Sequence, residues 1–297
     1  MKQPVFTGAA VAIITPMHAD GTVNFEELGR IIDDQIAHGT DAIVICGTTG
    51  ESAALNHEEH VECIRFAVKH TAKRVPVIAG TGSNDTAFAI EISKEAEEAG
   101  ADALLLVTPY YNKTSQAGLV RHFNAVADAV GLPMILYNVP SRTGMNIQPE
   151  TYAELAKHPL IVATKEASGN VSAIAKTAAL CGDELAIYSG NDDQIVPILS
   201  LGGAGVISVL SNLLPKQTSL LCKKFFDGDI KGSAEMQYKY LPLAHALFSE
   251  VNPIPVKAAM AAMGFCENFL RLPLTEMDEE KRQILLQEMR KVGIKTV

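Results

Sequence analysis

The 297-residue sequence has no apolar run that approaches the roughly 20 residues needed to span a bilayer. We therefore expect no membrane-spanning segment. Positive charge is also scarce, because 25 lysines and arginines face 34 aspartates and glutamates and leave a formal net charge of -9. Such a balance argues against a nucleic-acid-binding surface, although it leaves room for a small anionic substrate at a local basic site.

Cysteine pairs of the C-x-x-C type are absent too. The five cysteines are scattered along the chain: Cys46, Cys63, Cys181, Cys222 and Cys266. An odd, scattered set favours a reducing compartment over a disulfide framework. Near the amino terminus, Pro4, Thr7 and Gly8 interrupt the only stretch that resembles a signal peptide, so we interpret it as a strand. We expect a cytoplasmic protein.

Eight short apolar runs predict strands at 10–15, 42–46, 75–79, 103–107, 134–137, 161–165, 185–189 and 206–209. Between them, apolar residues spaced three and four apart predict helices at 25–37, 58–70, 87–99, 119–130 and 171–180. Strict alternation implies a parallel sheet, and eight is the number of strands in a (β/α)8 barrel. Several helical patterns are followed by glycines that match the left-handed cap: Gly39, Gly100, Gly131 and Gly182.

After residue 209 the strand signal stops. Helical patterns follow at 213–226, 231–250, 253–263 and 279–292, with breaks at Asp227-Gly228-Asp229 and at the Pro253/Pro255 pair. We therefore predict an α/β fold: a (β/α)8 TIM barrel that forms a catalytic domain over residues 1–227, followed by a C-terminal helical domain over residues 228–297.

The run at 161–165 ends on a lysine, Lys165. An amine at the carboxyl end of a buried strand loses water, so its pKa falls and the neutral nucleophile that forms Schiff bases becomes populated. The alternative is a lysine that extends its ammonium group from a strand end into solvent.

Polar residues follow other strands at the end of the barrel where catalytic groups are expected. They are Thr15, Gly47-Thr48-Thr49-Gly50-Glu51, Thr108-Pro109-Tyr110-Tyr111, Tyr137-Asn138-Val139-Pro140-Ser141-Arg142-Thr143-Gly144 and Gly190-Asn191-Asp192. Hydroxyls, phenols, one arginine and one lysine would converge there, which suits carboxylate binding and proton transfer. This convergence favours the Schiff-base interpretation of Lys165.

Each segment also has a structural alternative. The 47–51 segment fits a strand-to-helix turn with a capping pattern as well as a carboxylate-binding loop. Tyr110 and Tyr111 could pack at an interface. Tyr137 ends a buried strand, where its phenol needs a hydrogen-bond partner. Arg142 could be a solvated charge in a loop bounded by proline and glycine.

Three of these segments resemble the dihydrodipicolinate synthase family: the octapeptide 137–144, the G-T-T-G-E turn, and Lys165-Glu166-Ala167-Ser168-Gly169. The resemblance extends from Phe6 into the C-terminal helices. The octapeptide with Arg142 is highly specific, whereas the other two segments occur throughout the pyruvate-dependent aldolases. These include N-acetylneuraminate lyase, which typically lacks an arginine at this position.

The resemblance implies condensation of pyruvate with L-aspartate 4-semialdehyde in the diaminopimelate route of lysine biosynthesis. Lys165 would form the imine with pyruvate, and Tyr137 would transfer protons through Thr49 to Tyr111. Substrates would be held by Thr48 and Thr49 (pyruvate carboxylate) and Arg142 (semialdehyde carboxylate), with Gly190 and the Ile207 backbone leaving room beside the imine. The alternatives are another pyruvate aldolase such as N-acetylneuraminate lyase, which Arg142 disfavours, and a non-catalytic binding relative, which the intact catalytic set disfavours.

The resemblance further implies a homo-oligomer, a tetramer built from dimers, in which Tyr111 enters the neighbouring subunit's site. Regulated members carry a lysine effector pocket at that interface, whose positions here are Ser52, Ala53, His57, His60, Asn84, Phe88 and Tyr110. Phe88 stands where those members have a carboxylate, so we expect weak or absent inhibition by lysine.

Neither a metal nor a cofactor is expected. Gly202-Gly203-Ala204-Gly205 precedes a predicted strand, at the end of the barrel opposite to phosphate-binding loops, so a tight turn explains it better. His57 and His60 have no third ligand in a metal-binding pattern. No dinucleotide fingerprint occurs, and imine chemistry with pyruvate needs no cofactor.

Overall fold

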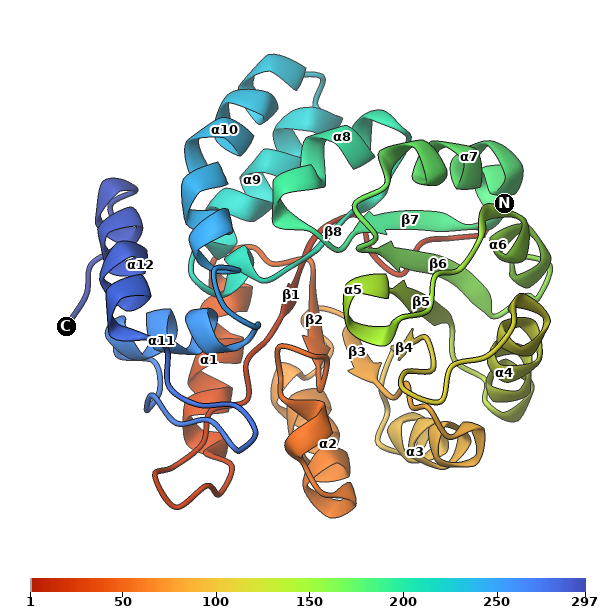
Figure 1. The fold of residues 1–297 in the computed structure, drawn as a ribbon, viewed down its shortest axis with the longest axis horizontal. Coiled ribbons are helices and arrows are strands. Elements are labelled where there is room, and N and C mark those ends of the chain that lie inside the picture. The colour runs from red at the N-terminus through yellow and green to blue at the C-terminus, as the bar shows by residue number, and fades with distance from the viewer. Residues whose placement is uncertain (1) are drawn as a thin grey trace.

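The computed structural model describes residues 2–297 and shows a closed barrel of eight parallel strands surrounded by helices (Figure 1). The strands are β1 (Gly8–Ala12), β2 (Ala42–Ile45), β3 (Val77–Gly80), β4 (Ala103–Val107), β5 (Met134–Asn138), β6 (Ile161–Glu166), β7 (Ala186–Ser189) and β8 (Gly205–Ser208). The barrel closes where β8 pairs with β1. A Cβ atom at Gly205 would lie 1.9 Å from the Gly8 carbonyl oxygen, so this closure requires glycine. The predicted (β/α)8 barrel is confirmed.

The helices of the barrel are α1 (Phe25–Ala37), α2 (His57–Thr71), α3 (Thr86–Glu98), α4 (Gln116–Ala129), α5 (Pro140–Thr143), α6 (Pro149–Leu155), α7 (Val171–Cys181), α8 (Ile195–Ser200) and α9 (Pro215–Phe226). The longer ones match the predicted patterns apart from shifts at their ends. The prediction misses α5, α6 and α8 because helices of 4, 7 and 6 residues contain too few turns to show a periodic pattern.

Gly131 corrects one part of the capping prediction. Gly39, Gly100 and Gly182 have positive φ angles, as expected for left-handed positions after helices. The helix α4 instead ends at Ala129, and the next residue, Val130, is extended. The Gly131 N–H then donates to Glu97 Oε1 at 2.8 Å, and a Cβ atom at Gly131 would lie 2.8 Å from that same oxygen. Glycine here allows a close approach of the Glu97 side chain and does not form a left-handed turn.

Three further helices form the C-terminal extension, which confirms that part of the predicted fold: α10 (Ile230–Ala246), α11 (Ile254–Ala262) and α12 (Glu279–Lys291). They lie beside α1 and α9 on one side of the barrel (Figure 1). Leu243, Met260 and Leu285 of these helices are buried in the same apolar core as Ile31 of α1. No helix within the described part of the chain is both long enough and apolar enough to cross a membrane.

A second apolar core fills the inside of the barrel. Side chains from alternating strand positions meet there, including Val44, Ile78, Ile135 and Ile207. Phe6 stacks on Tyr188 with ring centroids 4.3 Å apart, and the Tyr188 hydroxyl donates to the Phe6 carbonyl at 2.7 Å. The barrel is therefore packed rather than hollow, which leaves its carboxyl end for a site.

Candidate active site

Lys165 lies at the carboxyl end of β6, and only 5% of its surface is exposed. Its ammonium nitrogen lies 4.4 Å from the centre of the Tyr137 ring. The pKa of Lys165 is lowered from 10.5 to about 8, mainly by burial; the charge of Asp192 opposes this shift, and that of Arg142 contributes to it. The alternative of a lysine extended into solvent is therefore wrong.

Tyr137 is held opposite Lys165 by the pairing of β5 with β6. Burial raises the pKa of Tyr137, whereas the charge of Arg142 and a hydrogen bond with Thr48 lower it. The net shift is upward, so at neutral pH the phenol is protonated and can donate a proton or a hydrogen bond. The hydrogen-bond partner that a buried phenol requires is thus Thr48.

The two threonines of the G-T-T-G-E turn point to different partners. Thr48 meets the Tyr137 phenol, whereas Thr49 accepts a hydrogen bond from Asn252 Nδ2 at 3.0 Å. The structure therefore differs from the predicted relay, which placed Thr49 beside Tyr137. The reason lies in the turn: Gly50 N–H bonds to the Gly47 carbonyl at 3.1 Å, and this sharp reversal sends successive side chains in different directions.

The turn serves as a loop and not as a helix cap. Glu51 has a left-handed backbone, with a φ of 54°, and its side chain makes no capping bond to the short 3₁₀ helix Ser52–Ala54. The cap of α2 is Asn56, which forms a reciprocal capping box with Glu59. The capping alternative for the 47–51 segment is therefore wrong.

Arg142 belongs to the short helix α5 and donates from Nη2 to the Asn252 carbonyl at 2.9 Å. Together with Thr48 and Glu51 it lines a cavity of about 470 Å³. The same cavity contains six of the seven predicted effector residues: Ser52, Ala53, His57, His60, Phe88 and Tyr110. One continuous space therefore joins the neighbourhood of Arg142 to these positions.

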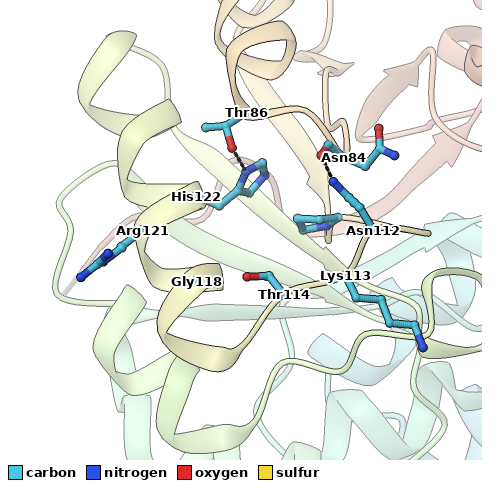
Figure 2. A pocket seen from close by; sticks show the side chains of 9 residues that line it. Asn84, Thr86, Asn112, Lys113, Thr114, Gly118, Arg121 and His122 are labelled. Carbon is cyan, nitrogen blue, oxygen red and sulfur yellow. Dashed lines mark hydrogen bonds between the residues drawn. The ribbon is translucent and has the colours of Figure 1, made fainter.

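Asn84, the seventh predicted effector residue, lines a separate cavity of about 330 Å³ (Figure 2). Its carbonyl accepts a hydrogen bond from Asn112 Nδ2 at 2.8 Å. Figure 2 shows the side chains of Lys113 and Arg121 directed away from each other at the edges of this cavity. Asn84 is thus the one predicted effector position that does not line the cavity shared by the other six.

Tyr111 does not reach Tyr137 within one chain, because its side chain is 91% exposed. Its backbone is left-handed, with a φ of 66°. A bulky residue in this conformation is a genuine outlier, and such strain often occurs at functional positions. The neighbouring Tyr110 is 37% exposed.

Gly190 borders Lys165, and Ile207 lies in the inner core of the barrel. A Cβ atom at Gly190 would lie 3.1 Å from Lys165 Cγ and 2.8 Å from Ala167 Cβ, so a larger residue would crowd the lysine. Ile207 is fully buried on β8 in the inner core that also contains Tyr137.

The sequence analysis named Asp192 among the polar residues that follow strands but gave it no role, and it did not select Asn252. Asp192, 3% exposed, accepts hydrogen bonds from the Ser208 hydroxyl and from the N–H groups of Val209 and Leu210 at 2.5, 3.0 and 2.9 Å. Its position after a strand is the signal that placed it at this end of the barrel. Asn252 had none, because it lies between two helices of the extension.

The two histidines with metal-like spacing have other partners. His57 Nε2 lies 2.8 Å from Glu95 Oε2, and His60 Nε2 is 2.7 Å from the Gly80 carbonyl oxygen. Over residues 2–297, histidine, cysteine and carboxylate side chains form no group of three or more that could hold a metal ion.

A buried lysine of lowered pKa, facing a tyrosine at the carboxyl end of a closed barrel, defines the class of Schiff-base-forming barrel enzymes. Residues 5–291 match the dihydrodipicolinate synthetase family, and the chain belongs to this family. It is similar to a 4-hydroxy-tetrahydrodipicolinate synthase of Lachnoclostridium phytofermentans, with 60% identity over 291 residues that cover 98% of this chain and 99% of the relative.

Solved structures agree. The crystal structure of dihydrodipicolinate synthase from Aquifex aeolicus superposes with a TM-score of 0.96 at 43% identity, covering 98% of this chain and 99% of that one. A monomeric dihydrodipicolinate synthase variant superposes with a TM-score of 0.96 at 40% identity, covering 98% of both chains.

Proposed function

We propose that this protein is a Schiff-base-forming lyase that condenses pyruvate with L-aspartate 4-semialdehyde to 4-hydroxy-tetrahydrodipicolinate. The observation that carries the proposal is Lys165, buried opposite Tyr137 with a pKa lowered to about 8. The names of the relatives support the same reaction. Condensation assayed beside N-acetylneuraminate cleavage tests it. We expect only the first activity, and cleavage without condensation would assign the chain to the other aldolases.

In the proposed mechanism, the neutral Lys165 amine attacks the ketone carbon of pyruvate, and water leaves to give an imine. Loss of a methyl proton converts the imine to an enamine, whose terminal carbon attacks the aldehyde of the semialdehyde. The substrate's amino group then attacks the imine carbon, which closes the ring and releases Lys165. Because the Tyr137 phenol lies beside the amine and is protonated, it is the proposed group that delivers and removes protons.

The hydroxyl contacts refine the proposed relay. Thr48 takes the place beside Tyr137 that Thr49 was expected to occupy. We retain both threonines as ligands of the pyruvate carboxylate, since a tight turn also presents backbone N–H groups to an anion. Gly190 and the Ile207 backbone would leave the room that the imine needs.

Replacing Arg142 with alanine should raise the Michaelis constant for the semialdehyde by roughly 10- to 150-fold, since a charge-assisted hydrogen bond is worth about 1.5–3 kcal/mol. Imine formation with pyruvate should stay nearly unchanged. Steady-state kinetics in each substrate measure both effects. Arg121→Ala, at the separate cavity, is the matched control and should alter neither constant. Equal damage to both substrates by Arg142→Ala would contradict the assigned role.

We further propose a homodimer in which Tyr111 completes the partner's relay, with two dimers forming a tetramer. The exposed side chain and strained backbone of Tyr111 support this arrangement, because such strain often occurs at functional positions and the side chain faces solvent within one chain. Tyr111→Phe and Lys165→Ala chains, each inactive alone, should regain activity in mixed dimers. Hybrid dimers that form without any recovery would argue against a shared site.

The five free, buried cysteines support a cytoplasmic location.

Lysine should inhibit weakly or not at all. The Phe88 ring packs edge-on against His57 with centroids 5.6 Å apart, and His57 already pairs with Glu95. A bound ammonium group would therefore meet a ring, worth about 0.5–2 kcal/mol, in place of a carboxylate. Initial rates titrated with lysine at subsaturating pyruvate measure the effect. Phe88→Glu should strengthen inhibition. Phe88→Gln should not, because glutamine has nearly the shape of glutamate but carries no charge. Potent inhibition of the unmodified protein would overturn this proposal.

We also retain the boundary between a barrel domain over residues 1–227 and a C-terminal helical domain over residues 228–297 as a proposal. The break between α9, which ends at Phe226, and α10, which begins at Ile230, supports it. Because the two parts share one apolar core, we expect the extension to depend on the barrel for its stability.

A further inference from the structure

We propose that Glu166 and Asn138 form a positioning pair that fixes Lys165, Tyr137 and the loop carrying Arg142 relative to one another. This inference rests on the proposed function. Both residues belong to the sequence motifs described above, and neither has a role in the mechanism. They belong to β5 and β6, but their side chains face away from the barrel interior, so they act on the chemistry only through their neighbours.

The Glu166 carboxylate is buried, with 5% of the residue exposed, and it has no cation within bonding distance among the described ion pairs. It is instead held by hydrogen bonds. Oε1 accepts from Asn138 Nδ2 at 3.0 Å and from the Ser168 N–H at 2.9 Å, and Oε2 accepts from Asn138 Nδ2 at 3.2 Å and from the Tyr152 hydroxyl at 2.9 Å. A carboxylate satisfied in this way holds its donors in place, because releasing any of them leaves buried charge uncompensated.

The strand register transmits this constraint to the catalytic side chains. Asn138 on β5 pairs with Glu166 on β6, directly after the pair formed by Tyr137 and Lys165. Since successive residues of a strand face opposite sides, the outer pair holds the strands while the inner pair faces the barrel interior. A misplacement of about 1 Å between reacting groups can lower a rate by about 100-fold.

Asn138 also secures the loop after β5. Its Oδ1 accepts from the Ile147 N–H at 3.1 Å, and its Nδ2 donates to Asn146 Oδ1 at 2.8 Å. These contacts anchor the end of the loop that begins with α5 and carries Arg142. One buried amide therefore connects the imine-forming pair to the residue proposed to hold the second substrate.

Tyr152 offers a matched control inside the same cluster. Its hydroxyl donates to Glu166 and accepts from the Thr164 hydroxyl at 3.0 Å, and over the described residues it makes no hydrogen bond to Asn138 or to the loop after β5. Tyr152→Phe removes one bond to the carboxylate from the side of α6. A purely structural cluster would respond alike to Tyr152→Phe and to Asn138→Ala.

The test compares Asn138→Ala, Glu166→Gln, their double variant and Tyr152→Phe in the full-length protein. We expect Asn138→Ala to lower the rate of pyruvate imine formation by about 10- to 100-fold and to raise the Michaelis constant for the semialdehyde. Glu166→Gln should have a smaller effect, and the double variant should be no worse than Asn138→Ala, because the two residues act as a unit. Tyr152→Phe should lower the melting temperature while leaving the imine rate near that of the unmodified protein.

Two results would overturn the proposal. One is an imine rate that falls to the same extent in Asn138→Ala and Tyr152→Phe, in step with their melting temperatures. The other is an unchanged imine rate in Asn138→Ala. Competitive acetylation of Lys165 across pH, measured by mass spectrometry, needs no substrate. It therefore distinguishes a failure of the positioning pair from a failure of the proposed function. If the unmodified protein forms no imine, the proposed function fails. An altered Lys165 titration in Asn138→Ala, but not in Tyr152→Phe, would then still support the positioning pair, and identical titrations would overturn it.

Discussion

Replacing Lys165 with alanine should lower the condensation rate by at least roughly 1,000-fold, because removal of a covalent nucleophile leaves only the catalysis that comes from binding. The side chain is buried, faces Tyr137 and has space beside it only because residue 190 is glycine. Steady-state rates with both substrates measure the loss. Lys176→Ala, an exposed lysine that pairs with Glu150 on the surface, is the control and should retain full activity.

The pH dependence of the unmodified protein should agree with this role. At pH 7, a lysine of pKa about 8 is neutral in about one tenth of the molecules, against about three in ten thousand at the ordinary value of 10.5. The neutral amine is the nucleophile, so the rate of imine formation should rise with pH and level off above about pH 8. A rate that keeps rising toward pH 10 would show that burial does not lower the pKa of the reacting lysine.

Replacing Lys257 with methionine should destabilise the protein by about 3–5 kcal/mol, the usual effect of breaking a buried ion pair. The side chains of Lys257 and Glu51 are both fully buried and in contact, and they join α11 of the extension to the G-T-T-G-E turn. In the variant, the Glu51 carboxylate keeps one hydrogen bond, which it accepts from the Arg271 N–H at 3.3 Å. Urea unfolding followed by circular dichroism measures the loss.

Two comparisons isolate the buried charge in the Lys257 experiment. The double variant Glu51→Gln with Lys257→Met should recover much of the lost stability, because it leaves no isolated charge in the core. Lys231→Met breaks a pair whose side chains are 89% and 65% exposed, and surface pairs of this kind contribute little. Equal losses in Lys257→Met and Lys231→Met would contradict the importance given to the buried pair.

The barrel and the position of Lys165 could be predicted because both depend on local patterns. A buried parallel strand is continuous and apolar, so its polar terminal residue is visible in the sequence, as Lys165 and Tyr137 are. The helix period likewise located α1 within its observed bounds. Patterns of this kind report which face of an element is buried and therefore where a barrel places its site.

Other parts of the site depend on geometry that local patterns do not contain. Whether Thr48 or Thr49 faces Tyr137 depends on the backbone angles of one tight turn. Asn252 meets Thr49 and Arg142 across long stretches of sequence, so its contacts arise only when α11 packs on the barrel. Tyr111 marks a third limit, because the role that we propose for it lies in a partner subunit and its side chain is exposed within one chain.

Reductive trapping tests the central claim most directly. The protein is incubated with pyruvate, reduced with borohydride, digested and mapped by mass spectrometry. The account predicts one reduced pyruvyl group on the peptide containing Lys165, formed more readily at pH 8 than at pH 6 because more of the amine is neutral. A label on another lysine, or no label at all, would contradict it.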